Sequence, residues 1–356
     1  MESFNMVVMQ EYIEQAEKSF MLAPLNEVDA MVFAQLAYYD FDQLDKPTTF
    51  SQFANPKLQE LLTSKSHQGT QLLQVLANSR RFNSIKCCNP KIITDRAQEI
   101  QFGAVIFQLP TGRAVIAYRG TPAITIGWKE DLNMTYRQVV PAQRLAQTYF
   151  KAWMRKHYWQ SVYLVGHSKG GNLATYVTLN ASTSQQKKIV ATYNFDGPGF
   201  LNQEERYQGK LTALQTKIHK YVPQQALIGL LLDDRFDYQV VASKGLGPAQ
   251  HFVTKWEIQD DHLVKVDDLQ TVSRWSKEVI DDWLNQLSSE ELQAFLSYGY
   301  QVANQANLTY FRELYALDKI LSVAKSTREL SPSAFEMAKN ILGKLLQSMI
   351  NQRFKK

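Results

Sequence analysis

The chain has 356 residues, of which 45% are hydrophobic and 21% are charged, and its formal net charge is +5. A chain of this size can bury the core of one large α/β domain and still carry additional helices. Lys and Arg are scattered along the sequence, which excludes a nucleic-acid-binding stripe. The charge leaves at most a weak attraction to anionic surfaces, such as a peripheral contact with a membrane.

The sequence predicts a soluble cytoplasmic protein without a metal or another cofactor. The N-terminal residues include acidic side chains and show no charged region followed by an apolar run, so we expect no signal peptide. We also expect no membrane span, because no run of about 18 apolar residues occurs. The two cysteines, Cys87 and Cys88, are neighbours, a spacing that suits neither an ordinary structural disulfide nor a zinc site.

The first hundred residues are predicted to form a helical lead-in. Apolar residues at helical spacing indicate a helix over residues 27–39, which Asn26 caps, and shorter helices over residues 58–62 and 71–77. Alternation typical of a sheet begins near Gln101. The lead-in is therefore expected to contribute helices and no strand.

Strands and helices alternate in the middle of the chain. A Pro-Thr-Gly turn joins the predicted strands 102–107 and 114–118 into a hairpin. The later predicted elements are a helix over 141–157, a strand ending at 165, a helix to about 182, strands over 189–195, 216–222 and 238–243, and a last edge strand over 255–264. This order predicts a mostly parallel sheet with helices on both faces. From about residue 272 onward the pattern is helical.

A serine between two glycines stands where the strand ending at residue 165 meets the next helix. The segment Gly166-His167-Ser168-Lys169-Gly170 fits the G-x-S-x-G pattern, in which a sharp turn presents one serine hydroxyl at the edge of a sheet. A Cβ at Gly166 or Gly170 would prevent the close approach that holds such a serine in a strained backbone conformation. Ser168 is therefore a candidate nucleophile, and the alternative is an ordinary glycine-rich turn.

A serine hydroxyl needs a base, and in α/β-hydrolases the acid and then the histidine follow the serine along the chain. Of the histidines after Ser168, only His251 follows both a predicted strand and a glycine-rich loop. His219 falls inside a predicted strand and His262 in a polar turn. We therefore take His251 as the candidate base and expect His167 to pack rather than to catalyse.

The acid that would orient this histidine has two candidate positions. Asp196 ends the strand that follows the elbow helix, at the edge where the serine is expected. Asp233, Asp234 and Asp237 lie in the loop after the next strand, a commoner place for such an acid, although the apolar run 227–232 and Arg235 suggest a helical turn with a solvated charge cluster. The residues leave open whether the acid is Asp196, one of the later group, or absent.

An oxyanion hole requires two backbone donors. One is the amide of Lys169, directly after the serine. The other is expected from the segment Tyr118-Arg119-Gly120-Thr121, which follows the hairpin. Gly120 lets the backbone approach a substrate, and Thr121 can add its hydroxyl to its amide.

These motifs resemble two families. Residues 117–121 (Ala-Tyr-Arg-Gly-Thr), followed by Trp128 and Asp131, resemble a signature of class 3 lipases, whose Gly-His-Ser-Leu-Gly-Gly elbow and closing histidine with a trailing tryptophan (here Trp256) are also similar. A closer resemblance is to a lipase-like, largely uncharacterised α/β-hydrolase family of Gram-positive bacteria. That family shares the Gly-His-Ser-Lys-Gly-Gly-Asn-Leu-Ala elbow and the Asn-Phe-Asp-Gly-Pro-Gly-Phe segment of residues 194–200.

The resemblance covers residues 25–265 and implies an α/β-hydrolase fold. It implies that Ser168 is the nucleophile, His251 the general base, and Thr121 and Lys169 the oxyanion donors.

The chain departs from the class 3 pattern in two places. Those lipases keep their acid in an Asp-x-Val-Pro segment, but the corresponding residues 219–223 contain no carboxylate, which favours Asp196. Lys169 stands where their elbow has leucine, and we expect its side chain either to be solvated or to favour an anionic substrate.

The sequence thus predicts an α/β-hydrolase domain over residues 1–270, including the helical lead-in, and a helical C-terminal extension over residues 271–356. The predicted function is that of a serine hydrolase that cleaves small-molecule carboxyl esters of lipid or lysophospholipid type through a Ser-His-Asp triad and an acyl-enzyme. The alternatives are a catalytically degenerate fold that serves as a binding or regulatory module, and an acyl-thioesterase or acyltransferase.

The C-terminal extension is open to three interpretations, as a lid, an oligomer interface or added packing. Aromatic residues near the elbow are expected in the core or along an acyl pocket: Tyr118, Trp128, Tyr136, Phe195 and Phe200.

Overall fold

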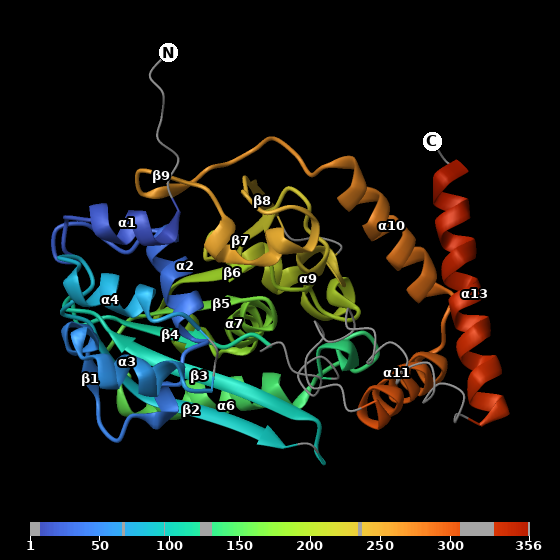
Figure 1. Cartoon of the computed structure of the whole chain (residues 1–356), viewed down its shortest axis with the longest axis horizontal. Helices are drawn as coiled ribbons and strands as arrows, with labels where there is room; N and C mark the ends of the chain where they lie inside the picture. The colour runs from blue at the N-terminus through green and yellow to red at the C-terminus, as the bar shows by residue number, and fades with distance from the viewer. Residues whose placement is uncertain are drawn as a thin grey trace.

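The computed structural model describes residues 8–65, 68–95, 97–121, 130–233, 237–306 and 331–354. At its centre is an eight-stranded sheet whose strands lie side by side in chain order (Figure 1). The strands are β1 Thr48–Thr49, β2 Lys86–Asp95, β3 Ile100–Gln108, β4 Ala114–Tyr118, β5 Val162–His167, β6 Ile189–Phe195, β7 Ile218–Pro223 and β8 Tyr238–Val241. Strands β1 to β4 pair antiparallel, whereas β4 to β8 pair parallel. The predicted hairpin and the α/β class are confirmed.

Helices cover both faces of the sheet (Figure 1). The helices are α1 Met9–Gln15, α2 Glu27–Leu36, α3 Pro56–Thr63, α4 Gln71–Asn78, α6 Pro141–Lys156, α7 Lys169–Asn180, α8 Thr183–Gln186, α9 Gln203–Leu214, α10 Thr271–Asn285, α11 Ser289–Gln305 and α13 Pro332–Phe354. Helix α2 packs on β4, β5 and β6, and α6 and α7 pack against the strands from the opposite face. Helix α2 begins where the sequence predicts, because Asn26 Oδ1 accepts a hydrogen bond from Asp29 N at 2.8 Å.

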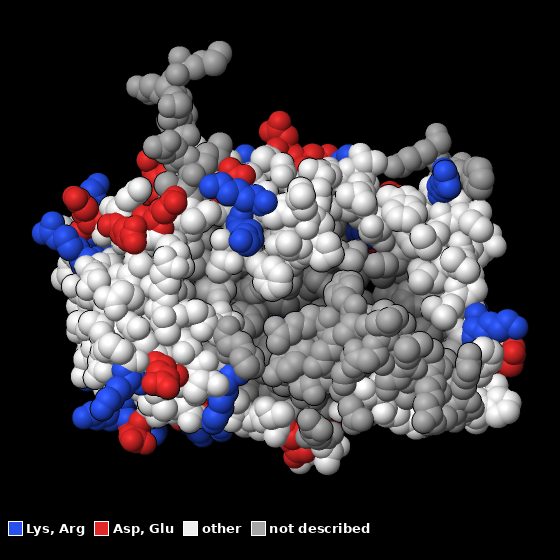
Figure 2. All heavy atoms as spheres, viewed as in Figure 1, with Lys and Arg blue, Asp and Glu red and all other residues white. Residues whose placement is uncertain are grey.

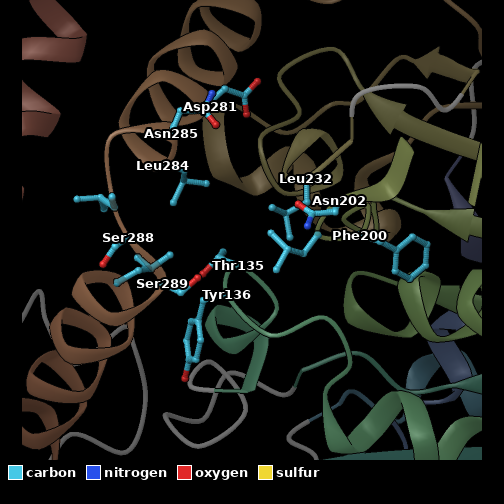
Figure 3. A pocket seen from close by; sticks show the side chains of 13 residues that line it. Thr135, Tyr136, Phe200, Asn202, Leu232, Asp281, Leu284, Asn285, Ser288 and Ser289 are labelled. Atoms are coloured by element: carbon cyan, nitrogen blue, oxygen red, sulfur yellow. The ribbon is translucent and has the colours of Figure 1, made fainter. Parts of the chain in front are cut away.

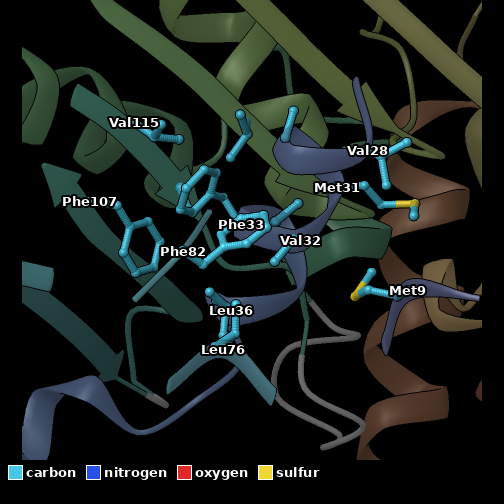
Figure 4. Packing of buried hydrophobic residues seen from close by; sticks show 14 of the residues in the cluster. Met9, Val28, Met31, Val32, Phe33, Leu36, Leu76, Phe82, Phe107 and Val115 are labelled. Atoms are coloured by element: carbon cyan, nitrogen blue, oxygen red, sulfur yellow. The ribbon is translucent and has the colours of Figure 1, made fainter. Parts of the chain in front are cut away.

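The apolar residues form two cores, one on each face of the sheet. On the α2 face, rings from the lead-in and the sheet pack together, among them Phe33, Phe82 and Phe107 (Figure 4). On the other face, Ile116 and Leu164 pack against α6 and α7. Because successive side chains of a strand point to opposite faces, the central strands are apolar along nearly their whole length, as expected for a sheet covered on both sides.

The expectation that the lead-in contributes helices and no strand was wrong. Strand β2 lies within the first hundred residues and pairs with β3 along its length. Asn89 and Pro90 interrupt its sequence pattern, and the strand accommodates them by a register shift between Cys88 and Lys91, with φ of 48° at Asn89. Cys87 and Cys88 lie on this strand, both as free thiols, and burial raises the pKa of Cys87 to about 12.

The predicted edge strand over residues 255–264 is also wrong. This segment forms a separate small hairpin of β9 Ile258–Gln259 and β10 His262–Leu263, outside the main sheet. Asp260, in the turn, has φ of 56°, a conformation in which a strand cannot continue.

The C-terminal helices pack on one another and are anchored to the sheet domain. Trp283 Nε1 of α10 donates to Ile341 O of α13 at 3.0 Å. At the start of α10, Gln270 N donates to Gln224 O at 2.9 Å, and the neighbouring Gln225 N donates to Gln250 Oε1 at 2.9 Å. The loop after β7 therefore joins α10 to the segment around residue 250.

The surface carries mixed charge. On the face shown in Figure 2, Lys and Arg side chains alternate with Asp and Glu around the edge of the molecule. Among the helices that the structure describes, none has the length and apolar character needed to span a bilayer.

A buried ion pair joins two segments of the lead-in, and its loss is predicted to destabilise the fold. The Arg81 guanidinium contacts both carboxylate oxygens of Asp29, which also accepts from Tyr12 OH at 2.8 Å. Arg81→Met leaves the Asp29 charge buried without its partner and should lower the free energy of unfolding by about 3–5 kcal/mol. Urea denaturation checks this, with Arg155→Met on the exposed side of α6 as the control. Equal stability of the two variants would contradict the prediction.

Candidate active site

The turn between β5 and α7 holds Ser168 in an uncommon backbone conformation. Its φ of 57° and ψ of −132° are those of the strained turn that the sequence pattern predicts. The glycines make this possible: a Cβ on Gly166 would lie 2.1 Å from the carbonyl carbon of Gly170, and a Cβ on Gly170 would lie 2.1 Å from Tyr118 O. Ser168 N donates to Phe195 O at 2.9 Å, so the serine sits where the carboxyl ends of β5 and β6 meet.

An imidazole and a carboxylate meet at the same edge. His251 Nδ1 lies 2.6 Å from Asp196 Oδ2. A carboxylate only accepts, so Nδ1 carries a proton, and in the neutral form of the imidazole Nε2 is then the nitrogen with the lone pair. Asp196 follows β6 directly and is 1% exposed, whereas the His251 side chain is 21% exposed. The other carboxylate oxygen, Oδ1, accepts from Gly229 N at 3.1 Å, which fixes the orientation of the acid.

His251 is positioned through its backbone as well. His167 precedes the serine, and its Nε2 donates to His251 O at 2.7 Å, with the two rings 4.5 Å apart between centroids. Trp256 Nε1 donates to Gln250 O at 2.8 Å from the other side of the short helical turn Gly247–His251. The structure therefore places His251 beside the elbow and in contact with Asp196.

A tyrosine from the lead-in completes this arrangement, and the sequence carried no signal for it. Tyr38 OH lies 2.9 Å from His167 Nδ1, and because Nε2 is the donor to His251, Nδ1 accepts from the tyrosine. Burial, with a smaller contribution from His251, holds the pKa of His167 well below its usual value, so this ring is neutral at pH 7. His167 is packed inside the protein, as expected, but it also links the lead-in to the candidate base.

The segment that ends at Thr121 runs beside the elbow. Gly120 fits between Tyr38 and the elbow, since a Cβ there would lie 2.0 Å from Tyr38 OH and 2.5 Å from His167 O. The Thr121 hydroxyl donates to Asp131 Oδ2 at 2.5 Å. Because that proton is already engaged, any donation from Thr121 to an oxyanion falls to its backbone amide.

The side chain of Lys169 is buried, contrary to both expectations. Its ammonium is neither solvated nor available to an anionic substrate: it is 1% exposed and lies 2.9 Å from Glu130 Oε2 and 3.2 Å from Asp131 Oδ1. Burial would lower the pKa of Lys169, but Asp131 and Glu130 outweigh it and raise this pKa above its usual value. Glu130 also accepts from Gln101 N at 3.0 Å. A lysine buried in the elbow in place of leucine requires such a counter-charge.

The alternative acid is engaged elsewhere. Asp233 is buried and ion-paired with Lys220, which stands in the stretch 219–223 where no carboxylate was found. Asp234 lies outside the described residues, as does Trp128.

The remaining histidines after the serine lie on strands, and two of the candidate aromatic residues are buried. His219 lies on β7, as the pattern predicted, whereas His262, which was expected in a polar turn, lies on β10 with its side chain exposed. Tyr118 and Phe195 are core residues.

Nothing in the described part of the chain resembles a metal centre. No group of three or more His, Cys, Asp or Glu side chains in those residues has the arrangement to hold an ion. The candidate site consists of a serine, an imidazole, a carboxylate and backbone amides.

Comparison with known proteins places the chain in a family. A family model described as Mbeg1-like matches residues 76–301, well over half of the sequence. The chain belongs to the Mbeg1-like family. A search of curated proteins finds no match. The region shared with the Mbeg1-like family contains Thr121, Ser168, Asp196 and His251, and it extends through α10 into α11.

The close contact at Gly166 gives a first prediction for this site. Gly166→Ala puts a methyl group against the backbone of Gly170, so the elbow must open and the variant should lose most of its folded population. The control is Gly209→Ala, an exposed position on α9 with open space around it, which should be neutral or stabilising by about 0.5–1 kcal/mol. Thermal unfolding measures both, and a Gly166→Ala protein as stable as the control would contradict the elbow packing.

The buried neutral His167 predicts a pH dependence of stability. The unfolded chain binds a proton on this histidine near pH 6.5, whereas the folded chain does so only at much lower pH, so lowering the pH favours unfolding. The free energy of unfolding should fall below pH 6.5 by up to about 1.4 kcal/mol per pH unit from this group. His167→Gln should reduce that slope without abolishing it, because burial also lowers the pKa of His219. Urea denaturation between pH 5 and 8 tests this, and parallel curves for the two proteins would refute it.

Proposed function

We propose that the chain is a serine hydrolase with an α/β-hydrolase fold that cleaves carboxyl esters of lipid or lysophospholipid type. The observation that carries the proposal is the 2.6 Å contact between His251 Nδ1 and Asp196 Oδ2, next to a serine in a strained strand-to-helix turn. Membership of the Mbeg1-like family supports a lipase-like hydrolase.

In the proposed first step Ser168 Oγ attacks the acyl carbonyl carbon. His251 Nε2 takes the hydroxyl proton as the Oγ–C bond forms, and Asp196 stabilises the resulting imidazolium and keeps the ring in one tautomer. The tetrahedral intermediate then collapses: the bond from carbon to the alcohol oxygen breaks, and Nε2 returns the proton to the leaving alcohol. The product is an acyl-enzyme on Ser168.

Hydrolysis of the acyl-enzyme repeats the same chemistry with water. His251 removes a proton from water, the hydroxyl adds to the acyl carbon, and the C–Oγ bond breaks as Ser168 regains its proton. In both steps the negative oxygen is stabilised by the amides of Lys169 and Thr121, and one such donor contributes about 3 kcal/mol to the barrier reduction. The partly exposed ring of His251 is accessible to both the alcohol and the water.

The case for a degenerate, purely binding fold rested on the absence of a carboxylate from residues 219–223. Asp196 supplies a carboxylate to His251 from the neighbouring strand, so that reason no longer applies. Thioester hydrolysis and acyl transfer use the same groups and differ in the leaving group or acceptor. We propose residues 271–356 as an extension of the hydrolase domain, which comprises residues 1–270.

Replacement of the proposed catalytic groups should abolish or strongly reduce turnover without unfolding the protein. Ser168→Ala should remove both hydrolysis of p-nitrophenyl esters and labelling by a fluorophosphonate probe. His251→Gln and Asp196→Asn should lower kcat by about 10²–10⁴-fold. The matched controls, Ser184→Ala on α8 and His262→Gln on the exposed hairpin, should retain full activity. Well-folded wild-type protein that neither turns over esters nor takes up the probe would overturn the proposal.

A further inference from the structure

One long segment of the chain is basic and contains no carboxylate. From residue 132 to residue 195 there is no Asp or Glu, whereas eight Lys or Arg occur. Two of the eight have acidic partners: Lys169 is buried against Glu130 in the elbow, and Arg137 lies 3.1 Å from Glu99. The other six define what we call the α6 basic surface: Arg144, Lys151, Arg155, Lys156, Lys187 and Lys188.

The basic side chains of α6 share its solvent-facing side. Arg144, Lys151 and Arg155 follow one another at intervals of seven and four residues, a spacing that places them on one side of a helix. All three are exposed, whereas Phe150 on the opposite side packs against the sheet. Basic residues that are scattered along the sequence therefore form a stripe along α6, and Lys156 extends it to the end of the helix.

No neighbouring carboxylate neutralises this stripe. None of the six side chains forms an ion pair with an acidic residue in the part of the chain that the structure describes. By contrast, Lys344 on α13 lies 2.9 Å from Glu291. Basic side chains without counter-charges produce a positive potential, which attracts an anionic partner.

Two large aromatic side chains stand at the end of the basic stripe. Tyr158 and Trp159 follow α6 within three residues and are 69% and 57% exposed, with their ring centroids 5.0 Å apart. The Lys188 ammonium donates to Trp159 O at 3.4 Å, which brings the second basic segment next to this turn. Tyr and Trp have an apolar body and a polar group, a combination that favours the boundary between lipid headgroups and acyl chains.

The aromatic end of the surface lies away from the candidate active site. Trp159 is three residues before the amino end of β5, whereas Ser168 follows its carboxyl end. The six residues of β5 span about 20 Å, so the tryptophan and the serine lie at opposite edges of the sheet. The cavity in Figure 3 is also separate: its lining includes Tyr136, Phe200 and the carboxylate of Asp281, but none of the six basic residues.

We propose that the α6 basic surface binds the anionic headgroups of a phospholipid membrane, with Tyr158 and Trp159 entering the headgroup region. The rings stand at the end of the stripe and do not alternate with the basic residues, as stacking platforms for single-stranded nucleic acid do. Because Ser168 is at the opposite edge of the sheet, this contact tethers the protein to the membrane without covering the serine. The inference does not depend on the proposed ester hydrolysis.

Sedimentation with vesicles tests the proposal on the full chain. The protein should bind vesicles of phosphatidylcholine and phosphatidylserine in equal parts at about 0.1 M salt, and should be released at about 0.5 M salt, because salt screens exposed charges. It should not bind vesicles of phosphatidylcholine alone. Lys151→Glu with Arg155→Glu should weaken binding at least tenfold, since each basic residue near an anionic membrane strengthens binding about fivefold.

Two further pairs of charge reversals complete this test. Lys187→Glu with Lys188→Glu should weaken binding from a separate segment, and it is the decisive pair if the α6 pair does not fold. The matched control is Lys46→Glu with Lys57→Glu, two exposed lysines of the lead-in, which changes the net charge equally and should leave binding close to that of the wild type.

Aromatic variants distinguish a membrane from other anionic partners. Tyr158→Ser with Trp159→Ser keeps the charge and should weaken vesicle binding several-fold, whereas Ser168→Ala should bind vesicles as the wild type does. Equal vesicle binding by the folded α6 reversal pair and the lead-in control would overturn the proposal. So would wild-type binding by the aromatic pair, or tighter binding of the protein to a mixed-sequence oligonucleotide than to the vesicles.

Discussion

The backbone of Ser168 depends on the near-contact of three chain segments. A non-glycine residue with positive φ costs about 1–3 kcal/mol and persists only where its surroundings determine it. Here Gly166 lets the start of α7 pack on β5, and Gly170 lets it pack on the end of β4. The same contacts bring the amide of Lys169 next to the loop that ends at Thr121. The strained serine and the two candidate oxyanion donors are therefore consequences of one packing constraint.

Buried polar groups then connect this turn to distant parts of the chain. Tyr38, from the segment after α2, bonds to His167, which bonds to the carbonyl of His251. On the opposite side of the serine, the Lys169 ammonium is neutralised by Glu130, which also accepts from the backbone of β3. A buried charge of this kind is costly without its partners, so Glu130 and Asp131 stabilise the Lys169 ammonium inside this protein.

The sequence allowed prediction of features that depend on local pattern. Apolar spacing and the Asn26 cap located α2, and two glycines located the turn at Ser168, because in each case the physical cause lies within a few residues. Strand β2 was missed since its pairing with β3 overrides the local effect of Pro90. The burial of Lys169 was missed because the partner carboxylates are about 40 residues away, a separation that only the fold closes.

The position of the acid was likewise predictable only in part from the sequence. The contact of Asp196 with His251 joins two residues far apart in sequence, and the strand order of the sheet brings them to one edge. Sequence reasoning placed both residues after strands but left Asp233 as an alternative. The ion pair of Asp233 with Lys220 explains why a carboxylate in that loop is engaged elsewhere.

The most direct test of the arrangement is a crystal structure of the protein after reaction with a fluorophosphonate. The adduct should lie on Ser168 Oγ, with His251 within hydrogen-bond distance. Its phosphoryl oxygen should lie about 2.7–3.1 Å from the amide nitrogens of both Thr121 and Lys169. An adduct on another residue, or a phosphoryl oxygen directed away from these two amides, would contradict the proposed site.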